Sequence, residues 1–384
     1  MGISLLFLSF FIGFSSCARP PISSHGGLHS DSPLSFENLR LRNAYTALQA
    51  WKRAISSDPL NLTANWLGSN VCSYSGVYCA PAPDDRALKT VAGIDLNHGD
   101  IAGNLPEELG LLTDLAVFHI NTNSFCGAVP DKFRDLKILF ELDLSNNRFA
   151  GAFPLVVLDL PSLKFLDLRF NEFKGTVPRE LFDKDLDAIF INHNMLTGPL
   201  PGNFGNSPVS AMVLADNKFG GCVPSSLGNM AGLEEIILSN NGFRSCLPAG
   251  IGRLKNTTVF DVSFNEITGP LPEEIGEMVS LEQLNVAHNK LSGGIPATLC
   301  RLPKLKKFIF SDNAFTGEVP DCLKIGEMED GGNCLPERPG QRSRDQCKPF
   351  FLSGPATAAH LDVGKLGTLC FINVKQYMQR QLPN

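Results

Sequence analysis

The chain has 384 residues, of which 43% are hydrophobic and 19% charged, and its formal net charge at pH 7 is −6. This composition is ordinary for a soluble protein, and the acidic balance excludes the strongly basic footprint of a nucleic-acid-binding protein. The length would suit two or three ordinary domains, but an internal repeat makes most of the chain one elongated body.

The amino terminus, residues 1–18, predicts a secretory signal peptide. Its apolar run from Ile3 to Phe14 is too short to span a bilayer, and the small residues at 15–18 suit cleavage. No later stretch reaches the roughly 20 apolar residues that a transmembrane helix needs. We therefore expect a secreted, extracellular protein without a transmembrane segment.

Residues 36–91 predict an N-terminal cap for the repeats that follow, because the first repeat of a stack needs a lid. An amphipathic helix is expected over residues 36–57, and a short loop between Cys72 and Cys79 predicts a local disulfide. A partner-binding helix is the alternative. The expected apolar stripe of the helix consists of Leu41, Ala44, Tyr45, Leu48, Trp51 and Ile55.

Residues 92–323 hold ten copies of one phrase, L-x-L-x-x-N-x-F/L-x-G-x-x-P, spaced by 23 or 24 residues. Self-similarity of this length and consensus predicts an α/β repeat fold, a leucine-rich repeat solenoid of ten repeats. The G-x-x-P ending is typical of the plant-type extracellular repeat. The first apolar strand residues are Ile94, Phe118, Leu142, Leu166, Ile189, Met212, Ile236, Phe260, Leu284 and Phe308.

Each phrase predicts one short strand, and the stacked strands predict a parallel sheet with a spacing of about 4.8 Å. The asparagine recurs in nine units, and an inward amide there can satisfy buried backbone groups. We therefore expect these asparagines to be structural. They are Asn123, Asn147, Asn171, Asn194, Asn217, Asn241, Asn265, Asn289 and Asn313.

The cysteine spacing predicts four disulfides, in keeping with an oxidising compartment. Cys222 and Cys246 stand at the same place in consecutive repeats, about one strand spacing apart, which a disulfide can bridge. The other predicted pairs are Cys72–Cys79, Cys300–Cys322 and Cys334–Cys347. Cys126 and Cys370 are left over, and either an intermolecular bridge or an inert thiol would explain Cys126.

Two N-glycosylation sequons, at Asn61 and Asn256, agree with secretion. The predicted repeats end at residue 323. Residues 324–348 then predict a cysteine-containing hinge, and residues 349–384 a divergent tail.

Several long phrases resemble the N-terminal half of the plant leucine-rich repeat extensins, and the resemblance covers about residues 36–348. The Asp84-Asp85 pair of the cap and the cysteine hinge are specific features of it. Residues 349–384 depart from the family, because they lack its Ser-Pro-rich extensin modules. The matching phrases are Asn65-Trp66 and the ranges 70–85, 91–98, 114–121, 125–127 and 333–347.

The resemblance implies a cell-wall protein whose repeat domain binds small basic cysteine-containing signalling peptides of the rapid alkalinization factor type. It also implies a homodimer and a role in wall assembly and growth sensing. Cell-wall polymers and receptor kinases are further candidate partners.

The outward strand positions favour a peptide-binding concave face. Acids outnumber bases there, and an apolar group lies near the middle, which is a pattern that marks binding surfaces and attracts a basic ligand. Scattered apolar residues on an unoccupied face are the alternative. The predicted apolar anchors are Phe165, Phe190, Val213 and Ile237, ringed by Glu141, Asp143, Asp167, Glu235 and Asp261.

The sequence does not favour an enzyme, a cofactor or a metal site. Asp143 and Asp167 are expected on an open sheet without a cleft to exclude water. His98, His193 and His288 share a register position but lie several repeats apart, roughly 15 Å or more, too far for one metal. The competing functions are a polygalacturonase inhibitor and a structural wall component that binds no peptide.

Overall fold

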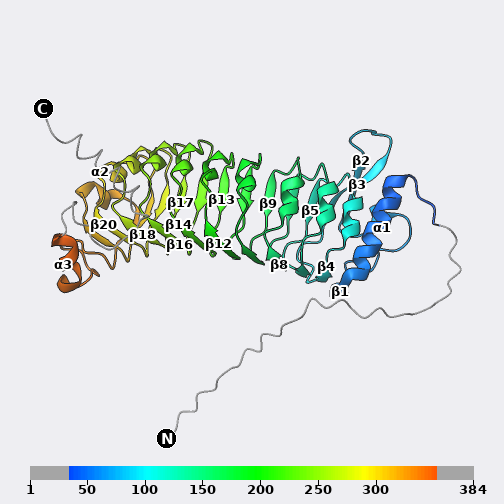
Figure 1. The fold of residues 1–384 in the computed structure, drawn as a ribbon, viewed down its shortest axis with the longest axis horizontal. Coiled ribbons are helices and arrows are strands. Elements are labelled where there is room, and N and C mark those ends of the chain that lie inside the picture. The colour runs from blue at the N-terminus through cyan, green and yellow to red at the C-terminus, as the bar shows by residue number, and fades with distance from the viewer. Residues whose placement is uncertain (1–33, 353–384) are drawn as a thin grey trace, which may run out of the picture.

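The computed structural model describes residues 34–352. The predicted signal peptide (1–18), most of the predicted tail (349–384), Cys17 and Cys370 therefore lie outside the described residues. The described chain is an elongated coil of repeats, with α1 (Leu39–Ala54) at one end and α3 (Arg344–Leu352) at the other (Figure 1).

Twelve strands form the main sheet, in the order β2-β3-β5-β7-β9-β11-β13-β15-β17-β19-β21-β23. The pair β2–β3 is antiparallel and the other pairs are parallel. The strands at the ten predicted positions contain the predicted apolar residues, and all ten of these are buried. The strands are β2 (Val77–Pro81), β3 (Lys89–Asp95), β5 (Val117–His119), β7 (Glu141–Asp143), β9 (Phe165–Asp167), β11 (Ala188–Phe190), β13 (Ala211–Val213), β15 (Glu235–Ile237), β17 (Val259–Asp261), β19 (Gln283–Asn285), β21 (Lys307–Ile309) and β23 (Glu327–Glu329).

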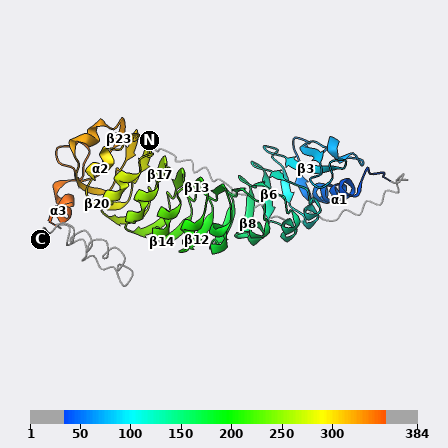
Figure 2. The same ribbon diagram turned by 90° about the horizontal axis from the view of Figure 1, so that it is seen from above.

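A second sheet of eleven strands runs along the coil beside the main sheet (Figures 1 and 2). Its first strand pairs antiparallel with the next, and the others are parallel. The strands are β1 (Ile55–Ser57), β4 (Ala102–Asn104), β6 (Ser124–Gly127), β8 (Arg148–Ala152), β10 (Glu172–Gly175), β12 (Met195–Pro199), β14 (Lys218–Gly221), β16 (Gly242–Ser245), β18 (Glu266–Gly269), β20 (Lys290–Gly294) and β22 (Ala314–Gly317).

Short helices complete each coil. The proline of each G-x-x-P phrase immediately precedes most of them, since proline cannot continue the strand ladder but suits the start of a helix. They are η1 (Val71–Ser73), η2 (Glu107–Leu111), η3 (Asp131–Asp135), η4 (Leu155–Asp159), η5 (Arg179–Asp183), η6 (Phe204–Asn206), η7 (Ser225–Asn229), η8 (Ala249–Arg253), η9 (Glu273–Glu277), α2 (Ala297–Cys300) and η10 (Pro320–Lys324).

The nine predicted asparagines form a hydrogen-bonded ladder inside the coil. Asn289 is representative: its Oδ1 accepts from the backbone N–H of Ile267 in the preceding coil at 2.9 Å. Its Nδ2 donates to the carbonyl oxygens of Val262 at 2.9 Å, Val286 at 3.2 Å and Ala287 at 3.1 Å. Each amide thus ties its own turn to the previous coil, which confirms the structural role that the sequence predicted.

The N-terminal cap is confirmed as a lid on the first coils. α1 begins after Asn38, whose side chain accepts from the backbone N–H of Leu41 at 3.0 Å, the usual helix N-cap contact. Trp51 is fully buried, and its ring lies 5.7 Å from Trp66 and 5.6 Å from Phe118, measured between ring centroids. The cap and the repeats therefore share one continuous apolar core.

At the other end the coil extends past residue 323, where the sequence placed the last repeat. β23 pairs with β21 in parallel, and Asn333 continues the asparagine ladder by accepting from the backbone N–H of Phe315 at 3.1 Å. The segment predicted as a hinge therefore begins with one more partial coil. Its missing G-x-x-P phrase explains why the repeat pattern did not reveal it.

Three disulfides lie where the sequence placed them: Cys72–Cys79, Cys300–Cys322 and Cys334–Cys347. The predicted Cys222–Cys246 bridge is wrong, because Cys222 is a free thiol. In the second sheet Gly221 pairs with Phe243, so Cys222 continues toward Arg244 and not toward Cys246. This register adds two residues along the strand, which puts the two Cα atoms about 8 Å apart, beyond the reach of a disulfide. Cys126 and Cys246 are both disulfide-bonded.

Within residues 34–352 no helix combines the length and the apolar character that crossing a bilayer requires. Both sequon asparagines, Asn61 and Asn256, are exposed. Their modification stays a prediction.

Candidate functional site

The main sheet aligns the predicted binding residues in two columns. Asp167, Phe190, Val213, Ile237 and Asp261 stand opposite one another on consecutive strands β9 to β17. The three apolar members are half-buried, as is Asp261. The result is a short apolar strip, formed by Phe190, Val213 and Ile237, with a carboxyl group at each end.

A second column reinforces the strip on one side. Phe165 lies on β9, and its ring centroid is 5.6 Å from that of Phe190 on β11. Val259, on β17, stands opposite Glu235 on β15. Two aromatic rings and several aliphatic side chains therefore meet on neighbouring strands, each half-buried, and the structure brings together the four predicted anchors.

Arg169 lies directly beside this strip. Its guanidinium carbon is 5.4 Å from the ring centroid of Phe190, a distance at which a cation interacts with an aromatic face. Its Nε is also 3.0 Å from Oδ2 of Asp167. The cationic side chain of Arg169 therefore already contacts both Phe190 and Asp167.

Two of the predicted acids are less accessible than expected. The exposed fraction is 8% for Asp143 and 1% for Asp167. Oδ1 of Asp143 accepts from the backbone N–H of Ser145 at 2.9 Å, and its Oδ2 accepts from Asn121 at 2.9 Å. Oδ2 of Asp167 is buried without a hydrogen-bond donor among the described residues, because the Nε–H of Arg169 is close but poorly directed.

Burial has a clear electrostatic effect on Asp167. Removal from water, together with the neighbouring charge of Asp143 on β7, raises the pKa of Asp167 from 3.8 to about 7. The backbone N–H and the guanidinium of Arg169 oppose this shift only in part. The carboxyl group therefore changes its charge near neutral pH.

The remaining predicted acids are available to a ligand. The side chain of Glu141 is 37% exposed, and its Oε2 lies 2.9 Å from Nε2 of His119. Glu235 and Asp261 are half-buried. The sequence did not predict the contacts of His119 and Arg169, although both residues lie in the outward columns. His119 is 22 residues from Glu141, and Arg169 is two residues from Asp167 and 21 from Phe190.

The described residues contain no group of three or more histidine, cysteine, aspartate or glutamate side chains placed to hold a metal ion. His98, His193 and His288 share one register position but lie on coils that are several repeats apart, and two of them contact aspartates. Nε2 of His193 is 3.2 Å from Asp216 and Nε2 of His288 is 3.4 Å from Asp312.

Comparison with known proteins identifies both the repeats and the cap. The family model for the leucine rich repeat N-terminal domain matches residues 43–80, and the model for the leucine rich repeat matches residues 280–302. Among solved structures, the ectodomain of the Arabidopsis receptor kinase HAESA, in complex with an extended IDA peptide hormone, aligns with a TM-score of 0.68 and 29% identity over 77% of this chain and 50% of that chain. A plant ice-binding protein aligns with a TM-score of 0.65 and 25% identity over 77% of this chain and 97% of that chain.

Two curated relatives from Arabidopsis thaliana match most of the chain. Leucine-rich repeat extensin-like protein 3 is 69% identical over 94% of this chain and 50% of its own length. Leucine-rich repeat extensin-like protein 4 is 72% identical over 88% of this chain and 67% of its own length. The chain thus spans about half to two thirds of the length of these relatives. It belongs to the family of leucine-rich repeat extensin-like proteins.

Proposed function

We propose that this protein is a secreted cell-wall protein that binds small basic cysteine-containing peptides, of the rapid alkalinization factor type, on its main sheet and so links wall assembly to growth. The observation that carries the proposal is the strip of Phe190, Val213 and Ile237, with the half-buried acids Glu235 and Asp261 beside it. An apolar centre within an acidic frame suits a ligand that is cationic and has apolar anchors.

The comparisons support the class of ligand more broadly. The similar HAESA ectodomain was solved with a peptide hormone bound, so a coil of this type can carry such a ligand. That likeness supports peptide binding as a class, and the basic character of the ligand is inferred from the charges on this sheet.

The side chains have different proposed roles. Phe165 and the strip residues supply the apolar contact, whereas Glu141, Glu235 and Asp261 attract the cationic ligand because they retain contact with water. The predicted direct contact of Asp143 and Asp167 with a ligand is revised, since both are buried. Asp167 acts instead by holding Arg169 beside Phe190.

A charge-reversal pair tests the proposal. The variant Glu235→Lys with Asp261→Lys should weaken binding of a synthetic basic disulfide-containing peptide by about tenfold or more, mainly by slowing association. The matched control is Glu273→Lys with Glu274→Lys on η9, outside the main sheet, which changes the net charge equally. Surface plasmon resonance at two salt concentrations measures both rates.

Equal losses in the two variants would show that only net charge matters and would contradict a site on the main sheet. Failure of the unaltered protein to bind any basic peptide would reject the proposed function itself. A loss confined to the main-sheet variant, reduced at high salt, supports it.

A further inference from the structure

One edge of the coil presents a row of residues with left-handed backbone. The residue just before each ladder position has a φ of 52° to 56° in all ten repeats. Asparagine, aspartate and histidine tolerate this conformation, whereas a β-branched or bulky aromatic residue there is unusual. We call these residues the left-handed row: His98, Thr122, Asn146, Phe170, His193, Asp216, Asn240, Phe264, His288 and Asp312.

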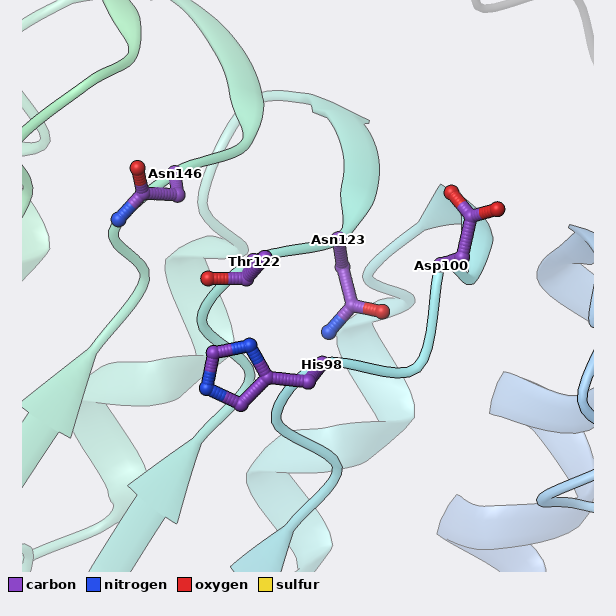
Figure 3. A pocket seen from close by; sticks show the side chains of 5 residues that line it. All are labelled: His98, Asp100, Thr122, Asn123 and Asn146. Atoms are coloured by element: carbon purple, nitrogen blue, oxygen red, sulfur yellow. The ribbon is translucent and has the colours of Figure 1, made fainter.

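The first three members of the row line a shallow pocket of about 280 Å³, together with Asp100 and Asn123. Figure 3 shows the imidazole of His98 and the hydroxyl of Thr122 between Asp100 at one end and Asn146 at the other. Every lining side chain is polar. Such a lining suits a ligand that hydrogen-bonds over its whole surface, because an apolar anchor would find no matching contact.

Most of these polar groups are free for a ligand. The amide of Asn123 is fully used, since its Oδ1 accepts from Ile101 and its Nδ2 donates to three backbone carbonyls. Within residues 34–352, by contrast, the side chains of His98, Asp100 and Thr122 have no hydrogen-bond partner, and all three residues are exposed. The pocket therefore offers a carboxylate, a hydroxyl and an imidazole, a mixture of donors and acceptors.

An exposed aromatic ring adjoins the pocket. Phe170 follows Asn146 in the row, one coil further along, and is 42% exposed. Its ring stacks on the imidazole of His193 with 4.0 Å between centroids, and His193 is held by Asp216 at 3.2 Å. The carbonyl oxygen of Phe170 accepts from the backbone N–H of Asn147 at 3.1 Å, so Phe170 stands beside Asn146 in the row, while His193 covers one face of its ring.

We propose that this edge binds a neutral oligosaccharide, with one sugar in the polar pocket and the next stacked on Phe170. A pyranose has an apolar C–H face that packs on an aromatic ring, and hydroxyl groups that both donate and accept hydrogen bonds. Asp100 and Asp216 at either end oppose an anionic sugar. This site lies on the left-handed row and is independent of peptide binding.

Phe170→Asn is the decisive variant, because asparagine tolerates the left-handed backbone and the fold should be kept or stabilised. Its matched control is Phe264→Asn. Phe264 has a φ of 52°, against 53° for Phe170, stacks on His288 with 4.1 Å between centroids, and lies four coils further along the row than Phe170. His98→Asn, within the pocket, serves as a second test in the same backbone conformation.

Isothermal titration with cellohexaose, xylohexaose and mannohexaose, and with hexagalacturonic acid as the anionic arm, tests the proposal. We expect at least one neutral hexasaccharide to bind the unaltered protein, with about tenfold weaker binding for Phe170→Asn and His98→Asn and unchanged binding for Phe264→Asn. The proposal is overturned if no neutral hexasaccharide binds, if Phe264→Asn loses as much as Phe170→Asn, or if the acidic hexasaccharide binds as tightly.

Discussion

Two asparagines of one coil, Asn285 and Asn289, face opposite sides of the same backbone. Asn289 points inward, accepts from one backbone N–H and donates to three backbone carbonyls. Asn285 points outward, where its Oδ1 accepts from the backbone N–H of Ala287 in its own turn at 3.2 Å, and its Nδ2 contacts two side chains of the preceding coil, Asp261 and Ser263, each at 3.2 Å. The inward amide bonds the backbone of the preceding coil, which is the same in every repeat, whereas the outward amide reaches the preceding coil only through side chains, which differ from coil to coil.

This difference separates what holds the molecule together from what it can bind. The inward face repeats because every coil must satisfy the same buried backbone groups. The outward face is free to vary, so its particular residues can define a ligand.

The largest effect on stability is expected from removing an inward asparagine. Asn289→Ala should lower the free energy of unfolding by about 3 kcal/mol or more, because it leaves several buried backbone groups without partners. Asn285→Ala, the same substitution on the outward side, should cost about 1 kcal/mol or less. Urea unfolding followed by circular dichroism measures both, and equal losses would contradict the division.

A buried outward residue should give the next largest effect. The pKa of Asp167 is raised to about 7, so the folded protein holds a proton that the unfolded chain releases near pH 3.8, and this group makes stability fall as the pH rises from about 4 to 7. Asp167→Asn should therefore be about 2 to 4 kcal/mol more stable than the unaltered protein at pH 8, and similar to it at pH 4.

Urea unfolding at both pH values checks this prediction. Asp261→Asn is the matched control, since Asp261 occupies the same place in its coil but is half-buried, and its Oδ1 likewise accepts a backbone N–H, from Ser263 at 2.8 Å. A stability difference for Asp167→Asn that does not change with pH would show that the carboxyl group is already ionised in the folded protein.

A smaller effect concerns the outward apolar strip and depends on the proposed peptide. Ile237→Ala should weaken binding of a basic peptide by about fivefold to tenfold. Ile309→Ala removes the same side chain at the same register, on β21 beyond the strip, and should change binding by less than about twofold. Equal effects of the two changes would place the ligand elsewhere on the sheet.

The smallest expected effect tests the corrected cysteine assignment. Cys222 is a free thiol, so Cys222→Ser should leave stability within about 0.5 kcal/mol. Cys300→Ser breaks a bridge between neighbouring coils and should cost about 2 to 4 kcal/mol. Thermal unfolding without reductant compares the two variants, and a large loss for Cys222→Ser would indicate a bridge after all.

The sequence predicted the coil, its strand positions and the asparagine ladder because these depend on a rule that every repeat obeys. It failed at Cys222, because strands of the second sheet pair in a register that differs by two residues from the register of the main sheet. It placed Asp167 on the outward side but could not give its burial, which depends on the size of neighbouring side chains such as Arg169. The extra coil around Asn333 lacks the repeat phrase and so was assigned to the hinge.

The covalent links at the far end of the coil have a mechanical consequence. Cys334–Cys347 closes a loop immediately after Asn333, and Cys300–Cys322 joins the two coils before it. A pulling force applied after residue 347 would be transmitted through the Cys334–Cys347 disulfide to Asn333, the last asparagine of the ladder. The Cys300–Cys322 disulfide holds together the two coils against which Asn333 packs. The two disulfides therefore oppose the stepwise unfolding of the last coils, so this end of the molecule is suited to withstand a mechanical force.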